Sequence, residues 1–191
     1  MHRLSASFVL GYHGCDQTAG ERILRGEPFH ASSNAYDWLG KGIYFWESNP
    51  ERALEFAKEK AARGGSRIKR PFAIGAVIEM GLCLDLASRS SVAILRESYG
   101  GLKRTHEEDG GKLPRNGEKF WQRYLDCAVV NHLHKILELG GSPSIDSVKG
   151  IFLEGNAIYP SSAFLEKTHV QIAVCNPLCI KGVFRVPDLR L

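Results

Sequence analysis

Two short segments carry residue types that can bind a ligand with a planar ring. Tyr12-His13-Gly14 ends an apolar run that begins at Ser7, and residues 38–45 read Trp-Leu-Gly-Lys-Gly-Ile-Tyr-Phe, in which a glycine-flanked turn leads to Tyr44. A histidine can hydrogen-bond to hydroxyl groups, and a tyrosine ring can stack on a cationic ring. We expect the two segments to form the two sides of a clamp for a nicotinamide dinucleotide. A turn histidine and a core tyrosine without a ligand are the alternative interpretation.

The composition limits the class of protein that can carry these segments. The chain has 191 residues, of which 43% are hydrophobic and 24% are charged, with a formal net charge of +4. This composition is typical of one globular domain spanning residues 1–191. No apolar run approaches the roughly 18 residues that a membrane span needs, and no small-residue cleavage site follows the N-terminus. We therefore expect a cytoplasmic protein with no membrane partner, and a mild positive charge that permits a polyanionic one.

The five cysteines are scattered along the chain without a C-x-x-C pair. Their spacing predicts neither a disulfide framework nor a zinc knuckle, so we expect reduced and mostly buried thiols. His132 and His134 follow Cys127 in a helical segment, but residues two apart do not share a helix face. We expect no metal site.

Turn residues and apolar periodicity divide the chain into elements. Residues 7–12 predict a strand, and Thr18-Ala-Gly-Glu21 has the form of a capping box for a short helix that ends at Gly26. Asn49 and Pro50 predict the start of a second helix. Residues 71–86 suit one bent strand or two, and strands are expected at 148–154, 168–174 and 180–186.

The middle of the chain, about 88–147, is predicted to be a helical insert. Residues 88–99 suit a helix, 100–117 are polar and rich in glycine, and 118–139 carry apolar residues at helical spacing before Gly140. Strands before and after such an insert favour an α+β fold over a doubly wound one. The chain has neither a G-x-G-x-x-G nor a G-x-x-x-x-G-K-[ST] motif, so a dinucleotide must be bound in another way.

The order and spacing of these motifs resemble the catalytic domain of poly(ADP-ribose) polymerases and other diphtheria-toxin-like ADP-ribosyltransferases. The resemblance covers residues 8–86 and 148–186 and leaves the helical insert unmatched. It rests on Tyr12-His13-Gly14, on residues 40–45, on a helix near Pro50, on the strand 74–80 and on a last strand that contains Gln171. The resemblance implies two small packed antiparallel sheets that form a cleft for NAD.

The resemblance also implies a role for each matched residue. His13 would bind the ribose hydroxyls of NAD, and the backbone of Gly14 would approach the nicotinamide carboxamide. Tyr44 would stack on the nicotinamide ring. Phe56 could close the other side of that ring or be an ordinary core residue. Where the family often has a serine that binds the carboxamide, this chain has Arg52 or Ala53.

Gln171 occupies the position where the family usually has a glutamate. A glutamate would bind the ribose 2′-hydroxyl and stabilise the oxocarbenium-like transition state, whereas glutamine keeps a hydrogen bond and loses the charge. That loss would cost on the order of a few kcal/mol, so either the acceptor is a good nucleophile or another acid assists. Glu154, Glu166 and Glu47 are the candidate acids.

The segment before Gln171 is expected to contact the acceptor substrate, because the corresponding loop does so in related toxins. Its candidate residues are Glu154, Glu166, Lys167 and His169. His169 lies two positions before Gln171, so both share a face of the strand. It could act as a base, bind substrate or be a solvent-facing histidine at a strand edge.

The function implied by the resemblance is mono-ADP-ribosylation, with NAD as co-substrate and a nucleic acid or a protein as acceptor. The size of the chain resembles that of bacterial toxins, for which an antitoxin is a possible partner. The main alternative is an inactive module that binds NAD or ADP-ribose. An RNA 2′-phosphotransferase of the same fold usually needs a second histidine, which Tyr44 replaces here. A structural or interaction domain is a further alternative.

Overall fold

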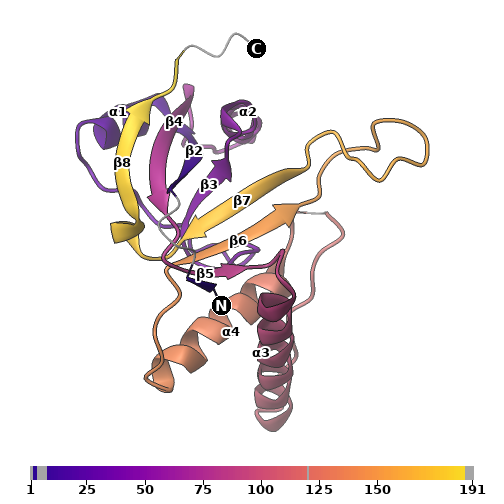
Figure 1. Cartoon of the computed structure of the whole chain (residues 1–191). Helices are drawn as coiled ribbons and strands as arrows, with labels where there is room; N and C mark the ends of the chain where they lie inside the picture. Colours follow the sequence, from indigo (N-terminus) through magenta and orange to yellow (C-terminus); the bar gives the residue numbers. More distant parts are fainter. Residues whose placement is uncertain (1, 4–7, 120, 188–191) are drawn as a thin grey trace.

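The chain forms a mixed α+β structure built on one sheet, in a computed structural model that describes residues 2–3, 8–119 and 121–187 (Figure 1). Among these residues the strands are β1 (His2–Arg3), β2 (Phe8–Asp16), β3 (Ile43–Glu47), β4 (Pro71–Glu79), β5 (Leu82–Asp85), β6 (Ser147–Phe152), β7 (His169–Val174) and β8 (Ile180–Arg185). The helices are α1 (Gln17–Leu24), α2 (Pro50–Ala61), α3 (Arg89–Glu108), α4 (Tyr124–Leu139) and the 3-10 helix η1 (Pro177–Cys179). The predicted α+β class is confirmed.

The sheet is continuous in the order β1-β5-β6-β7-β3-β2-β4-β8, so the expectation of two separate sheets is wrong. β3 pairs with β7 on one side and with β2 on the other, and this strand joins the two halves. The β2–β3 ladder has only the pairs Gly11–Glu47 and Tyr12–Trp46, whereas the β2–β4 ladder extends along the whole of β2. Two halves of one sheet therefore meet at a short ladder.

The helical insert is the connection between two parallel strands. β5 and β6 pair in parallel, and parallel neighbours need a long crossover, which α3 and α4 supply. α3 runs through Gly100 and Gly101, although the sequence predicted the helix to end at residue 99, before a polar, glycine-rich segment. A Cβ at Gly101 would lie 3.1 Å from Nε2 of His132, so glycine allows α3 to approach α4 closely there. Figure 1 shows both helices below β5 and β6.

Two helix starts differ from the prediction. Asp16, rather than Thr18, is the N-cap of α1, because β2 continues to Asp16 and its side chain accepts a hydrogen bond from Thr18 N at 2.9 Å. Three such bonds from backbone amides lower the pKa of Asp16. α4 begins at Tyr124 rather than near residue 118. Asn116 Oδ1 accepts a hydrogen bond from Leu125 N at 2.9 Å and so caps the helix from a distant position.

Other local predictions are confirmed. Asn49 caps α2 by accepting a hydrogen bond from Arg52 N at 2.9 Å, and Pro50 is the first helical residue. Residues 71–86 form two strands, β4 and β5, separated at Gly81, which has a φ of 57°. The three C-terminal strands are present as β6, β7 and β8.

The sheet has two faces that pack against different helices. On one face, Phe45 and Ile78 belong to a buried cluster, and α1 lies over β4. On the other face, Ala173 and Val148 pack against Val130 of α4, and Trp46 packs against Phe56 of α2. We call these the α1 face and the α2/α4 face. Because side chains alternate along a strand, neighbouring residues of β2, β3 and β7 point to opposite faces.

In the part of the chain that the structure describes, none of the helices combines the length and apolar character that crossing a membrane requires.

Candidate functional site

The β2–β3 ladder ends beside the segments that the sequence singled out. The carbonyl oxygen of Leu10 accepts a hydrogen bond from Ser48 N at 2.9 Å, so the backbone groups of residues 10, 12 and 14 are directed toward β3. Pairing stops after Tyr12–Trp46, which leaves Gly14 and Tyr44 outside the ladder. The carbonyl oxygen of Tyr44 accepts a hydrogen bond from His13 Nδ1 at 2.8 Å instead. The backbone pairing therefore ends where the Gly14 backbone faces β3.

His13 lies on the α1 face of the sheet, within β2 rather than at its end. Its ring is 5.5 Å from the ring of Phe29 and 5.7 Å from the ring of Phe45, measured between centroids. Burial lowers the pKa of His13. Because Nδ1 donates to a carbonyl oxygen, the neutral ring has its lone pair on Nε2, which can accept a hydrogen bond from a hydroxyl group.

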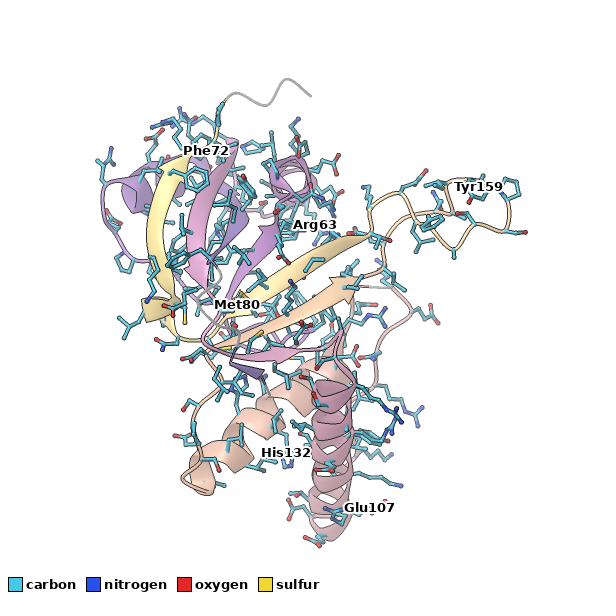
Figure 2. The ribbon with its side chains drawn as sticks, viewed as in Figure 1. Arg63, Phe72, Met80, Glu107, His132 and Tyr159 are labelled. Carbon is cyan, nitrogen blue, oxygen red and sulfur yellow. The ribbon has the colours of Figure 1, made fainter. Side chains whose placement is uncertain are left out.

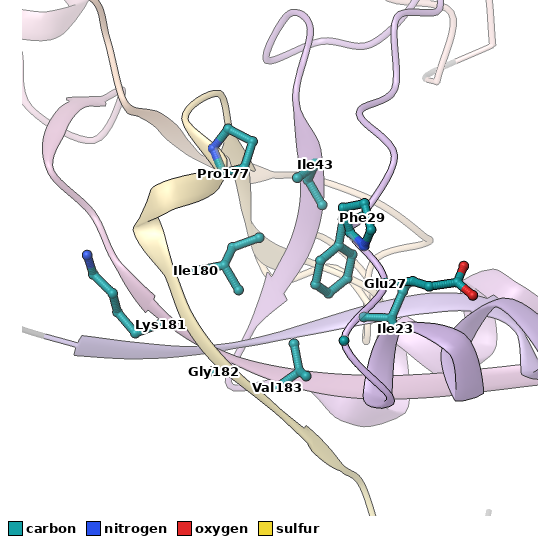
Figure 3. A pocket seen from close by; sticks show the side chains of 11 residues that line it. Ile23, Glu27, Phe29, Ile43, Pro177, Ile180, Lys181, Gly182 and Val183 are labelled. Carbon is teal, nitrogen blue, oxygen red and sulfur yellow. The ribbon is translucent and has the colours of Figure 1, made fainter.

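A cavity of about 280 Å³ lies on this face next to Phe29 (Figure 3). Its wall is mostly apolar, and its charged lining residues are Glu27 and Lys181, whose charged ends point away from it in Figure 3. The other lining residues come from α1, the loop after it, β3, η1 and β8: Ile23, Gly26, Pro28, Phe29, Ile43, Pro177, Ile180, Gly182 and Val183. Phe29 contacts His13 and lines the cavity, so the histidine and the cavity are neighbours.

Tyr44 points to the α2/α4 face, opposite to His13. Its hydroxyl group donates to the carbonyl oxygen of Gly40 at 2.8 Å and accepts from Leu39 N at 3.0 Å. Burial raises the pKa of Tyr44. The hydroxyl thus fixes the turn before β3, and the half-buried ring packs against the cluster that contains Val130 and Ala173. A ligand that contacts both His13 and Tyr44 would have to pass between β2 and β3 beyond the end of their ladder.

Gln171 lies on the α2/α4 face directly opposite Trp46 in the β3–β7 ladder. Its Oε1 accepts a hydrogen bond from Nε1 of Trp38 at 2.6 Å. The bond fixes the amide so that the two N–H donors of Nε2 point away from Trp38. Trp38 was not predicted as a site residue. Its position just before the Gly40-Lys41-Gly42 turn, close to Tyr44 in the sequence, could have indicated it.

His169 lies on the same face of β7 as Gln171, as predicted, but it is only 5% exposed. Nδ1 donates to the carbonyl oxygen of Lys167 at 2.6 Å, and the buried Nε2 has no hydrogen-bond partner among the described residues. The ring packs near Trp46 and Phe152, at centroid distances of 6.0 Å and 5.6 Å. Burial lowers the pKa of His169. The solvent-facing interpretation is wrong.

The other residues predicted for the acceptor loop are held by internal contacts. Glu154 is 7% exposed, and both of its carboxylate oxygens accept hydrogen bonds from Arg52, at 2.8 and 2.9 Å. Lys167 Nζ is 2.7 Å from a carboxylate oxygen of Glu59, which also contacts Arg52. Exposed Glu166 accepts from the backbone of Asn156 at 3.2 Å in the loop 153–168, which projects from the sheet (Figure 1).

None of the three candidate acids is an unpaired carboxylate next to Gln171. Glu154 is paired with Arg52, Glu166 lies in the projecting loop, and Glu47 points to the α1 face, 2.7 Å from Lys149 Nζ.

Phe56 packs against Trp46, with centroids 4.8 Å apart, rather than against Tyr44. Ala53, one of the two residues at the position of the family's serine, approaches β2 closely. A Cβ at Gly14 would collide with the carbonyl oxygen of Ala53. Glycine at position 14 therefore allows α2 to pack on β2, in addition to any contact with a ligand.

Cysteine and metal chemistry receive little support from the geometry. All five cysteines are free, and burial raises the pKa of Cys175 to about 12, which disfavours the nucleophilic thiolate. Within residues 2–3, 8–119 and 121–187 no group of three or more His, Cys, Asp or Glu side chains is arranged to hold a metal ion.

The chain is similar to an uncharacterized protein of Methanocaldococcus jannaschii. The two are 26% identical over an alignment of 187 residues that covers 89% of this chain and 83% of the relative. Because so little of the chain is left uncovered, the alignment includes much of the α3–α4 crossover. No family model and no solved structure matches the chain.

Proposed function

We propose that this chain is a mono-ADP-ribosyltransferase that uses NAD as its co-substrate, on a fold related to that of the diphtheria-toxin-like enzymes. The observation that carries the proposal is the strand order β7-β3-β2. It makes neighbours of the strands that hold Gln171, Tyr44 and His13, which are far apart in the sequence.

The end of the β2–β3 ladder suits the nicotinamide end of NAD. The amide and carbonyl of Gly14 are directed toward β3 beyond the end of the ladder, and a carboxamide offers the complementary donor and acceptor. The cavity beside Phe29 suits an apolar nucleoside part, since ligand sites are mostly apolar with few polar groups. His13 lies between the two and would bind a ribose hydroxyl.

The reaction breaks the bond between ribose C1′ and the nicotinamide nitrogen, and nicotinamide leaves with the electron pair. A nucleophilic atom of the acceptor forms the new bond to C1′, and its proton is released to solvent. Gln171 would donate a hydrogen bond through Nε2, because Trp38 already occupies Oε1. Without a carboxylate to activate a ribose hydroxyl as the next acceptor, a single transfer is favoured over chain elongation.

The same Trp38–Gln171 bond favours one alternative, a module that binds NAD without cleaving it. A fixed amide donor can hold a ligand but adds no negative charge near a developing cation.

Titration calorimetry with NAD, together with chromatographic measurement of released nicotinamide, separates these functions. We expect the wild type to bind NAD and to release nicotinamide. Tyr44→Phe should keep the affinity for NAD, and Tyr44→Ala should weaken it roughly tenfold or more because stacking is lost. Tyr99→Ala, at an exposed tyrosine of α3, is the matched control. Binding without release would favour the binding module, and the absence of both would refute the proposal.

A further inference from the structure

An aromatic side chain flanked by cations lies at the end of α2. The guanidinium carbon of Arg63 is 5.5 Å from the ring centroid of Trp121, and Lys119 Nζ is 5.9 Å from it. Tyr36 meets the same ring edge to face, at a centroid distance of 5.6 Å. Three segments that are distant in sequence thus converge, and Figure 2 labels Arg63 at this location.

A second pair of the same kind lies on α2 itself. Lys60 Nζ is 5.4 Å from the ring centroid of Phe56, one helical turn before it. Phe56 and Lys60 precede Arg63 along the chain, so both pairs involve the C-terminal part of α2 or the residues just after it. We call the six residues Tyr36, Phe56, Lys60, Arg63, Lys119 and Trp121 the cation–aromatic surface.

The cations of this region have no carboxylate partner among the described residues. Residues 58–70 contain six exposed cations: Lys58, Lys60, Arg63, Arg67, Lys69 and Arg70. The single acid in that segment, Glu59, already contacts Arg52 and Lys167. Elsewhere, by contrast, Lys149 and Lys181 are each within 2.8 Å of a glutamate oxygen. A positive field that the protein itself does not neutralise favours a polyanionic partner.

The cation–aromatic surface is linked to Gln171 through Trp38 and Trp46. Trp38, which donates to Gln171, is two residues from Tyr36, and Tyr36 contacts Trp121. Trp46, directly opposite Gln171, contacts Phe56. The contacts of Trp46 and Phe56, and the short backbone segment between Trp38 and Tyr36, therefore connect the proposed transfer site with the same set of cations and rings.

We propose that the acceptor is a single-stranded nucleic acid, an inference that rests on the proposed function. Its phosphates would contact Lys60, Arg63 and Lys119, and its bases would stack on Trp121 and Phe56. Proteins that bind single strands combine a cationic path with aromatic rings on which unpaired bases stack. A duplex hides the faces of its bases, so the rings favour a single strand.

A protein acceptor would fit a different surface, the projecting loop 153–168. This loop exposes apolar side chains, including Leu153 at 60% and Phe164 at 66%, and Tyr159 lies near its tip (Figure 2). Its lysine, Lys167, is paired with Glu59. The loop has no unpaired cation to bind a phosphate, so the cation–aromatic surface is the one that fits a nucleic acid.

The test measures the fluorescence anisotropy of labelled single-stranded RNA and DNA of about 20 nucleotides at several salt concentrations. We expect Arg63→Glu/Lys119→Glu to weaken binding at least tenfold and to reduce the salt slope by about 1.4, or about 0.7 for each lost phosphate contact. Trp121→Ala should weaken binding about 5- to 100-fold, and Trp121→Phe much less, since a ring remains. Arg96→Glu/Lys135→Glu, at exposed cations of α3 and α4, makes the same charge change and should leave binding unaltered.

Incubation of a lysate with radiolabelled NAD then identifies the modified molecule. Label that nuclease removes and protease leaves would support the inference, and label that behaves in the opposite way would overturn it in favour of a protein. Equal loss of binding in the control variant, or no oligonucleotide binding by the wild type, would also overturn it. NAD binding and nicotinamide release by the wild type without oligonucleotide report on the proposed function separately.

Discussion

The imidazole of His13 donates the hydrogen bond to the Tyr44 carbonyl oxygen that a backbone amide would donate in a longer β2–β3 ladder. Its Nδ1 donates to the Tyr44 carbonyl oxygen at 2.8 Å, at the position where a continuing ladder would bring the amide of Gly14. A side chain therefore connects β2 to β3 beyond the last backbone pair, and Gly14 remains outside the ladder. The histidine thus has a structural task as well as the proposed contact with NAD.

His13→Ala is expected to weaken NAD binding about tenfold and to lower the free energy of unfolding by about 1–2 kcal/mol, because the partly buried Tyr44 carbonyl loses its donor. His13→Asn can still donate to Tyr44, so it should recover part of the stability but not the affinity. Calorimetry and urea denaturation measure the two effects. His30→Ala, at an exposed histidine, is the control. Unchanged affinity in His13→Ala would contradict the role of His13 in binding.

Gln171→Glu is expected to increase nicotinamide release about tenfold or more. The new carboxylate can still accept the Trp38 hydrogen bond through one oxygen and would present the other, with its charge, to the developing cation. Steady-state kinetics with NAD measure the change. Gln171→Met, which has a similar length and no amide, is the matched control and should show no gain. A Gln171→Glu variant as slow as the wild type would mean that Gln171 lies away from the reacting bond.

The sequence predicted elements with local signals and failed where distant residues decide the structure. Asn49 and Pro50 predicted the start of α2 because a cap needs only its neighbours. The Trp38–Gln171 bond joins residues 133 positions apart, and the Arg52–Glu154 pair spans 102 positions, so no local pattern reveals either. The capping box failed for a related reason: β4 extends the pairing of β2 to Asp16, and the helix starts after it.

Removing one partner of the Arg52–Glu154 pair is expected to destabilise the fold by about 3–5 kcal/mol. Both side chains are less than 10% exposed. Arg52→Met leaves the buried Glu154 carboxylate without its guanidinium, and Glu154→Leu leaves the buried guanidinium with the more exposed Glu59 and Glu55, at 3.4 and 3.8 Å. Arg52→Met and Glu154→Leu should each be severe, and the double variant should recover much of the loss. Urea denaturation of the double-mutant cycle measures the coupling. Lys103→Met/Glu107→Leu, at an exposed pair 3.6 Å apart on α3, is the control and should show a coupling below about 1 kcal/mol.

Because His169 is buried, we expect the free energy of unfolding to fall as the pH is lowered below the ordinary histidine pKa of 6.5. Burial lowers its pKa below the ordinary 6.5, supported by Arg52 and opposed by the Lys167 carbonyl, Glu154 and Glu59. The unfolded chain then binds more protons than the folded one, so this contribution is complete above pH 6.5 and is lost as the pH falls through the folded pKa.

We therefore expect the unfolding temperature to drop between about pH 7.5 and about pH 5.5, by roughly 2–4 °C for each kcal/mol lost. The drop should be smaller in His169→Gln, because glutamine cannot be charged. It should not vanish, since burial also lowers the pKa of His13 and His134. Calorimetry at several pH values makes the measurement, with His30→Gln as the control at an exposed histidine. An equal drop in His169→Gln and the wild type would show that protonation of His169 does not oppose folding.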